Sequence, residues 1–227
     1  MTQIIFKYDL GKDTENFIRG TRAKNSSKPT RLQEVYVAQN GTDYDEVKVK
    51  EFLESYANEI SLDPNKAVKE LEESWKKIEK TFLQRIETMF KITYPTSQIT
   101  AYLTTNQRCT YNIPENYFFV NFTAKSSNHI IMHELFHFYT WYTLHDDLVA
   151  AGIDENQYNN IKESLTILLN TEFLELMNGA HDEGYPQHVE MREKVQELWS
   201  SSKNIREVAS GVFSLPNPSN SSSYSSS

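Results

Sequence analysis

Residues 133 to 137 read His-Glu-Leu-Phe-His, and their types and spacing are well suited to chemistry. Two histidines four positions apart on a helix point to the same side, so both imidazoles can bind one metal ion. Glu134 follows His133 and can remove a proton from a water molecule that the ion holds. The arrangement suits zinc-dependent hydrolysis of a peptide bond, with His133 and His137 as ligands of Zn²⁺ and Glu134 as general base.

The helix that must carry these residues is apolar on every side. A helix of this kind over residues 129–145 is expected to be buried. Two neutral histidines and a glutamate on a buried helix need a partner, and a metal ion satisfies all three together. The apolar residues are Ile130, Ile131, Met132, Leu135, Phe136, Phe138, Trp141, Tyr142 and Leu144.

A catalytic zinc site normally has three protein ligands and keeps one position for water. One type places a third histidine six residues after the second, but this position is Thr143 and no glycine lies between. His145 is twelve residues beyond His133, about 18 Å along a helix, so it cannot bind the same ion. The third ligand is therefore expected among the carboxylates that follow.

Glu163 is the predicted third ligand. It lies near the start of a second helix, expected over residues 158–176, and its side of that helix carries apolar and small polar residues. An unpaired carboxylate there would be costly, and a metal ion removes the cost. Glu172 is the main alternative because it also lies among leucines, and the remaining carboxylates are Asp154, Glu155 and Glu175.

The chain resembles the gluzincin metallopeptidases in two segments, His133–His137 and Lys162–Thr166. Its length is similar to that of the minimal members of that family. The resemblance covers about residues 97 to 180. It implies an α+β, zincin-like fold: a small mixed sheet, an active-site helix and a glutamate helix, here with additional long helices. It also implies an edge strand that binds an extended peptide, for which residues 117–122 are the candidate.

The chain departs from the larger gluzincins at one position. They have an aspartate four residues after the ligand glutamate, where this chain has Ile167, so Asn170 is the candidate residue for orienting a zinc-bound histidine instead. An oxyanion stabiliser is also expected after the glutamate helix. Tyr185 and His188 are the candidate catalytic donors, and the alternative for them is a packed tyrosine and an exposed histidine.

Composition limits the partners. The chain has 38% hydrophobic and 12% aromatic residues, typical of a globular protein, and a net charge of −8. This charge argues against nucleic acid or an anionic membrane surface, and leaves a peptide or protein substrate. Cys109 cannot form an internal disulfide, and the start of the chain has no signal-peptide pattern, so a cytoplasmic location is expected. Nothing indicates an oligomeric state.

The pattern along the chain predicts three regions. Residues 62–213 are expected to form a zincin-like catalytic domain, and residues 1–61 are expected to form N-terminal strands and a helix that pack on it. Residues 214–227 are expected to be a disordered serine-rich tail. The expected strands are 3–9, 34–38, 97–104 and 117–122. The other expected helices start at Asp43, run without a break from Asp63-Pro64 to Met89, and cover 187–200.

Two other functions stay open. The fold could be a zincin-like binding protein without catalysis, whose edge strand captures a peptide or protein partner. The site could also belong to a metal-assisted hydrolase that acts on a small amide. A closed site with four protein ligands would favour the binding protein, and no fourth ligand has suitable spacing.

Overall fold

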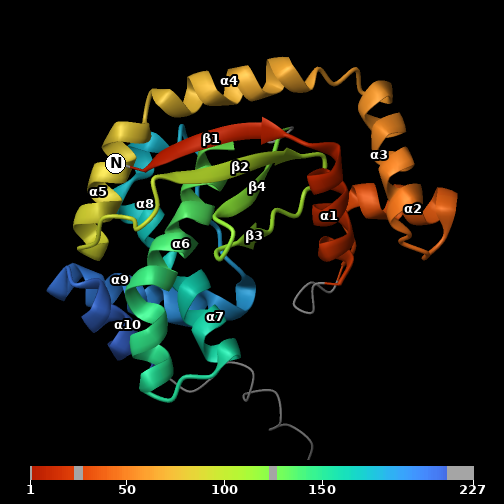
Figure 1. The fold of residues 1–227 in the computed structure, drawn as a ribbon. Helices are drawn as coiled ribbons and strands as arrows, with labels where there is room; N and C mark the ends of the chain where they lie inside the picture. Colours follow the sequence, from red (N-terminus) through yellow and green to blue (C-terminus); the bar gives the residue numbers. More distant parts are fainter. Residues whose placement is uncertain (1, 23–27, 123–126, 214–227) are drawn as a thin grey trace, which may run out of the picture. The chain divides into compact units, whose positions relative to one another are not determined.

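A computed structural model describes residues 2–22, 28–122 and 127–213 of the chain (Figure 1). They form a mixed α+β structure in two compact units. One unit contains residues 2–79 and 96–131, and the other contains residues 80–95 and those from 132 onward. The serine-rich tail, 214–227, lies outside the described residues. The regional boundaries expected from the sequence stay predictions.

A four-stranded mixed sheet organises the first unit. Its order is β1-β2-β4-β3, with β1 (Gln3–Tyr8), β2 (Gln98–Thr104) and β4 (Tyr117–Asn121) parallel and β3 (Tyr111–Asn112) antiparallel to β4. Every residue of β4 is buried, which explains its unbroken apolar run. The strands expected at 3–9 and 97–104 are confirmed.

The prediction that residues 117–122 form an edge strand is wrong. β4 lies between β2 and β3, so β1 and β3 are the edges of the sheet in the described part of the chain. The chain turns back before β4, and Phe119 donates its backbone N–H to the carbonyl of Thr110 (2.8 Å). β3 has only two residues, too few for a period-2 pattern to reveal it.

Capped helices lie at one end of the sheet and along β1 (Figure 1). They are α1 (Leu10–Thr21), α2 (Arg31–Asn40), α3 (Glu46–Glu59) and α4 (Pro64–Lys76), and Asp9, Thr30, Asp45 and Asp63 accept backbone N–H groups at their starts. Phe17, Tyr36 and Phe52 meet in a core that α1, α2 and α3 share. The helix after Asp63 therefore begins as expected, whereas Asp45 caps α3 in place of Asp43.

The strand expected at 34–38 is wrong, because these residues lie in α2. Thr30 and Gln33 form a capping box in which each side chain binds the backbone of the other. This start fixes a helix in which Tyr36 is buried and Val35 faces outward, 37% exposed. The local hydrogen bonds and the burial of Tyr36 outweigh the weak strand preference of the valines.

The long helix expected up to Met89 is also interrupted. α4 ends at Lys76, and α5 (Glu79–Phe90) begins after a tightened turn in which Ile78 donates to the carbonyl of Trp75 (2.9 Å). Apolar residues keep their spacing of three and four across a turn of this kind. Periodicity therefore predicted the apolar face correctly and missed the break in the backbone.

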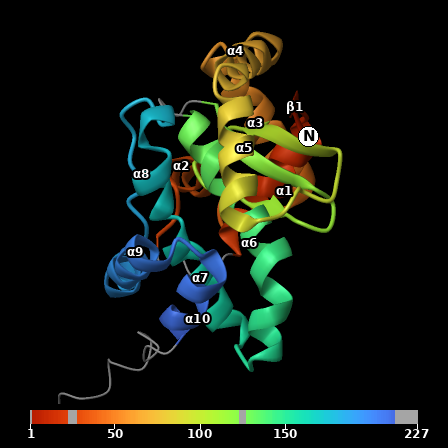
Figure 2. The same cartoon turned by 90° about the vertical axis from the view of Figure 1, so that its left-hand side faces the viewer.

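The second unit is helical. Its helices are α5, most of α6 (Ser127–Ala150), α7 (Glu155–Leu165), α8 (Leu168–Glu172), α9 (Val189–Ser202) and α10 (Ile205–Phe213). Figure 2 shows α7, α9 and α10 side by side, and residues of all three are in contact. The burial expected for residues 129–145 is confirmed for residues 131–140, where every residue except the partly buried His133 is buried. It does not hold at the ends of that range, since residues 129, 130, 141 and 145 are partly exposed and Tyr142 is 37% exposed.

The helix expected over 158–176 is three shorter pieces. α7 ends at Leu165, α8 starts at Leu168, and a 3₁₀ turn follows at Leu174–Leu176. A second 3₁₀ turn, Pro186–His188, leads into α9, in the region where a helix over 187–200 was expected. None of the helices in the described ranges has the length and apolar character needed to cross a membrane.

One buried carboxylate in the sheet unit should make stability depend on pH. Asp13 on α1 accepts hydrogen bonds from the hydroxyl of Thr104 (2.5 Å) and from the backbone and hydroxyl of Thr105 (3.0 and 2.9 Å). Burial raises the pKa of Asp13 to about 6, although these hydrogen bonds oppose the shift. The folded state therefore binds a proton at Asp13 more tightly than the unfolded state does.

We expect the Asp13 contribution to be fully present below its ordinary pKa of 3.8 and to be lost as pH rises through about 6. Relative to Asp13→Asn, the wild type should lose up to about 3 kcal/mol of unfolding free energy over that window, at about 1.4 kcal/mol per pKa unit. Urea unfolding of both proteins between pH 4 and 7 measures the difference. A difference that does not change with pH would contradict the shifted pKa.

Candidate metal centre

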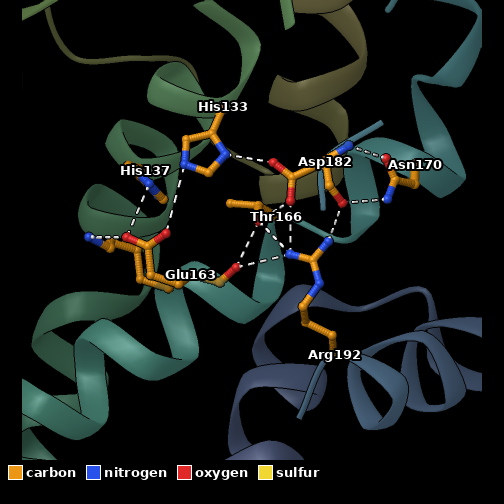
Figure 3. Close-up of polar contacts among 8 residues, drawn as sticks. His133, His137, Glu163, Thr166, Asn170, Asp182 and Arg192 are labelled. Carbon is orange, nitrogen blue, oxygen red and sulfur yellow. Dashed lines mark hydrogen bonds and ion pairs between the residues drawn. The ribbon is translucent and has the colours of Figure 1, made fainter. Parts of the chain in front are cut away.

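α6 carries the first part of the candidate centre. The rings of His133 and His137 lie on one side of this helix, with centroids 4.5 Å apart and planes at 79° (Figure 3). His137 and Glu134 are buried, at 2% and 6% exposure, and His133 is partly buried. The spacing of four residues therefore produces the shared orientation that the sequence predicted.

α7 brings Glu163 to the two histidines. Its Oε1 lies 3.4 Å from Nε2 of His137, and its Oε2 lies 3.8 Å from Nε2 of His133. One ligand atom from each of the three residues lies within 4.8 Å of the others. Ligands about 2.1 Å from a tetrahedral ion are about 3.4 Å from one another, so these distances fit a single metal ion.

The structure adds a carboxylate that the sequence pattern does not indicate. Asp182 places Oδ2 at 2.6 Å from Nδ1 of His133. A carboxylate can only accept, so the imidazole proton lies on Nδ1 and the lone pair of the neutral ring lies on Nε2, the atom nearest Glu163. Contacts of this kind orient metal-binding histidines and raise their basicity. Asp182 is 49 residues from His133, in a loop where Glu183 offers the same chemistry, so no spacing identifies it.

Asp182 is itself fixed on several sides (Figure 3). Its Oδ1 lies 2.8 Å from Nη1 of Arg192 and 2.8 Å from the hydroxyl of Thr166, where the predicted long helix breaks. The side-chain amide of Asn170 exchanges two hydrogen bonds of 2.8 Å with the Asp182 backbone. Asn170 thus contacts Asp182, and it is this carboxylate that contacts His133.

Arg192 holds this arrangement together. Its guanidinium, 5% exposed, donates to the carboxylate and the backbone carbonyl of Asp182 and to Thr166. Gly184 makes room for it, because a Cβ at Gly184 would lie 2.5 Å from Nη1 of Arg192. Gly184 also has a φ of +65°, which suits glycine.

The buried charges shift the pKa values of the ligands. Burial opposes protonation of His133, but the hydrogen bond and charge of Asp182 outweigh it and raise the pKa of His133 to about 9. Burial lowers the pKa of His137 well below its usual value, so this ring is neutral. Burial acts to raise the pKa of Glu163, but the neighbouring His137, Lys162 and His133 outweigh burial and lower this pKa to about 2. A metal ion would find His137 and Glu163 ready to bind and would displace one proton from His133.

The other candidate residues lie as follows. Glu172, the alternative third ligand, accepts from Nε1 of Trp199 (2.6 Å) and from Lys203 (2.5 Å). His188 is buried, with Nε2 at 3.1 Å from Oδ1 of Asn160. Tyr185 is 50% exposed, and its ring centroid is 5.7 Å from that of His188. The structure therefore brings Glu163, and not Glu172, to the histidine pair.

The chain has no match among protein-family models, curated proteins or solved structures. The class of the site is therefore defined by its own geometry: two histidines and a carboxylate that could hold one metal ion, with a second carboxylate behind His133.

Asp182→Asn tests the carboxylate behind His133. The variant keeps the size of the side chain and removes the charge, so we expect affinity for Zn²⁺ to fall about 10- to 100-fold. Competition with a chromophoric chelator measures the affinity, and circular dichroism checks the fold. Glu183→Gln, an exposed neighbour, is the matched control and should bind like the wild type. Equal affinity in a folded Asp182→Asn protein would contradict the assignment.

Alanine substitutions at two glycines can separate the effect of displacing Arg192 from the effect of a positive φ. Gly184 and Gly179 both have positive φ, +65° and +80°, but nothing lies within 4 Å of a Cβ at Gly179. We expect Gly179→Ala to cost about 1 kcal/mol of unfolding free energy. Gly184→Ala should cost more and also weaken Zn²⁺ binding, because Arg192 must move. Equal effects of the two substitutions on both measurements would exclude the role given to Gly184.

Proposed function

We propose that the chain is a zinc-dependent peptidase of zincin-like fold, with His133, His137 and Glu163 as the ligands and Glu134 as the general base. The observation that carries the proposal is the meeting of these three ligand atoms within 4.8 Å, with Glu134 next to His133 on the same helix. A small mixed sheet and the succession of a histidine helix and a glutamate helix also agree with the resemblance to gluzincins.

The donor set favours zinc. Two imidazole nitrogens and one carboxylate form a common catalytic zinc site that leaves a position for water, whereas hard ions such as Mg²⁺ prefer oxygen ligands. A zinc ion bound there would act as a Lewis acid that lowers the pKa of a water molecule and polarises a carbonyl group. A tight structural site would need a fourth protein ligand, and the described His, Cys, Asp and Glu residues offer none to the His133, His137 and Glu163 group.

Glu134 has the properties of a base that works near neutral pH. It is 6% exposed, and its Oε2 is buried with no hydrogen-bond partner among the described residues. Burial raises the pKa of Glu134 to about 7. A carboxyl group with this pKa can accept a proton from water and donate it to the leaving amine in the same cycle.

Tyr185 is the better of the two oxyanion donors expected from the sequence. The amide oxygen of Asn160 can only accept, so the N–H of a neutral His188 is directed to it, and burial lowers the pKa of His188. The Tyr185 side chain is half exposed and carries a hydroxyl group that can donate to a substrate.

Glu134→Gln is the direct test of the reaction. The amide cannot accept the proton from water, so we expect kcat to fall by at least about 10³-fold with one zinc still bound per chain. A peptide mixture analysed by mass spectrometry gives the activity, and atomic absorption gives the metal. If Glu134→Gln cleaves peptides at the wild-type rate, Glu134 is not the base. If the wild type binds zinc and cleaves nothing, the non-catalytic binding protein is the better account.

The third ligand can be tested with two glutamates of the same unit. We expect Glu163→Gln to lose stoichiometric zinc, because a neutral amide is a much weaker ligand than a carboxylate. Glu172→Gln should keep one zinc per chain, because Glu172 binds Trp199 and Lys203. Metal analysis of both proteins, purified without added zinc, gives the zinc content per chain and so identifies the third ligand. A zinc content near one in Glu163→Gln would rule out Glu163.

A further inference from the structure

Lys162 is a buried charge that the roles assigned above do not use. It lies on α7 directly before Glu163 and is only 4% exposed. Lysine is almost never buried to this degree unless it is paired, because removing its charge from water is costly. Its Nζ lies 3.0 Å from Oε1 of Glu163.

The ammonium group of Lys162 faces the same space as the candidate metal ligands. Oε1 of Glu163, which it contacts, is also the oxygen 3.4 Å from Nε2 of His137. Two of the candidate ligands, His137 and Glu163, and the ammonium group therefore lie together.

This position is unfavourable for metal binding alone. A positive charge 3.0 Å from a ligand oxygen repels a divalent cation and competes with it for the oxygen's electrons. With an apolar side chain at this position, the Glu163 carboxylate would bind the metal ion without competition from an ammonium group. A cation beside the ligands is favourable where a reaction develops negative charge next to the ion.

Arg192 is the other buried cation of the described helices in this unit, and its hydrogen bonds differ from those of Lys162. Its planar guanidinium is engaged by Asp182 and Thr166. Lysine is a compact point charge with three rotatable donors, so Lys162 can keep one hydrogen bond to Glu163 and direct another to a bound substrate.

We propose that Lys162 is a catalytic residue whose ammonium group donates a hydrogen bond to the scissile carbonyl oxygen as that oxygen gains negative charge. Lys162 keeps its proton, and no covalent bond to it forms or breaks. The inference rests on the proposed peptidase function and deepens it, because it gives the site a charged oxyanion donor in addition to the proposed donor Tyr185.

Lys162→Met is the main test, because methionine has a similar length and tolerates burial. With a peptide that the wild type cleaves, we expect kcat to fall about 10²- to 10³-fold with little change in KM, as for loss of one oxyanion donor. Zinc affinity, measured with a competing chelator, should be unchanged or higher. The matched control is Lys194→Met on α9, which removes a more exposed lysine paired with Glu197 and should leave both quantities unchanged.

Three results would overturn the inference. The first is a kcat equal to that of the wild type. The second is weaker zinc binding, which would mean that Lys162 acts through Glu163. The third is an effect on KM limited to peptides with a free carboxylate and absent from their amides, which would mean that Lys162 binds the substrate's C-terminus.

Two further variants complete the design. If Lys162→Met does not fold, Lys162→Gln decides, because it keeps a neutral donor: kcat should fall at least tenfold, about the rate ratio for 1.4 kcal/mol, and wild-type kcat would overturn the inference. Glu134→Gln separates the two proposals. An inactive Glu134→Gln beside a fully active Lys162→Met would remove the role of Lys162 alone, whereas wild-type activity in Glu134→Gln, or no cleavage by the wild type, would remove both.

Discussion

The contact between Nδ1 of His133 and Oδ2 of Asp182, 2.6 Å long, is the interaction on which the candidate centre depends. It fixes the ring of His133 and puts the lone pair of the neutral imidazole on the side of Glu163. Asp182 can serve in this way only because Arg192, Thr166 and Asn170 hold it. The break between α7 and α8 lies at Thr166, which contacts Asp182, and Gly184 closely approaches Arg192.

Buried charges in the helical unit occur as pairs. Arg192 faces Asp182, and Lys162 faces Glu163. Each pair loses hydration on folding, so neither is an efficient way to stabilise a fold. Around Glu163, the neighbouring groups outweigh burial and lower the pKa of this carboxyl group to about 2, so it stays ionised in an interior where burial alone would favour its neutral form. Glu134 has no pair of this strength, and its pKa near 7 is the expected result.

Much of the candidate site could be predicted from the sequence because it depends on helical geometry. The spacing of His133 and His137 decides their common orientation, and the apolar surroundings of Glu163 on its helix indicated that it faces inward. Asp182 could not be found in this way. It acts from a loop, and its partner is brought to it by tertiary packing, for which the sequence contains no period.

The errors in the fold have similar causes. The capping box of Thr30 and Gln33 indicates a helix start, but the valines around Tyr36 favoured the prediction of a strand. The strand β3 has two residues, which is too short for a recognisable pattern. The breaks after Lys76 and Leu165 preserve the spacing of the apolar residues, so this spacing does not reveal them. At these two breaks the prediction succeeded for the buried face and failed for the hydrogen bonds of the backbone.

The central claim is that His133, His137 and Glu163 hold one zinc ion. The most direct measurement is an anomalous difference map at the zinc absorption edge, from crystals of protein purified without added metal. The account predicts one peak, about 2.0–2.2 Å from Nε2 of each histidine and from a carboxylate oxygen of Glu163. A map with no peak there, or with a peak that Glu163 does not contact, would contradict it.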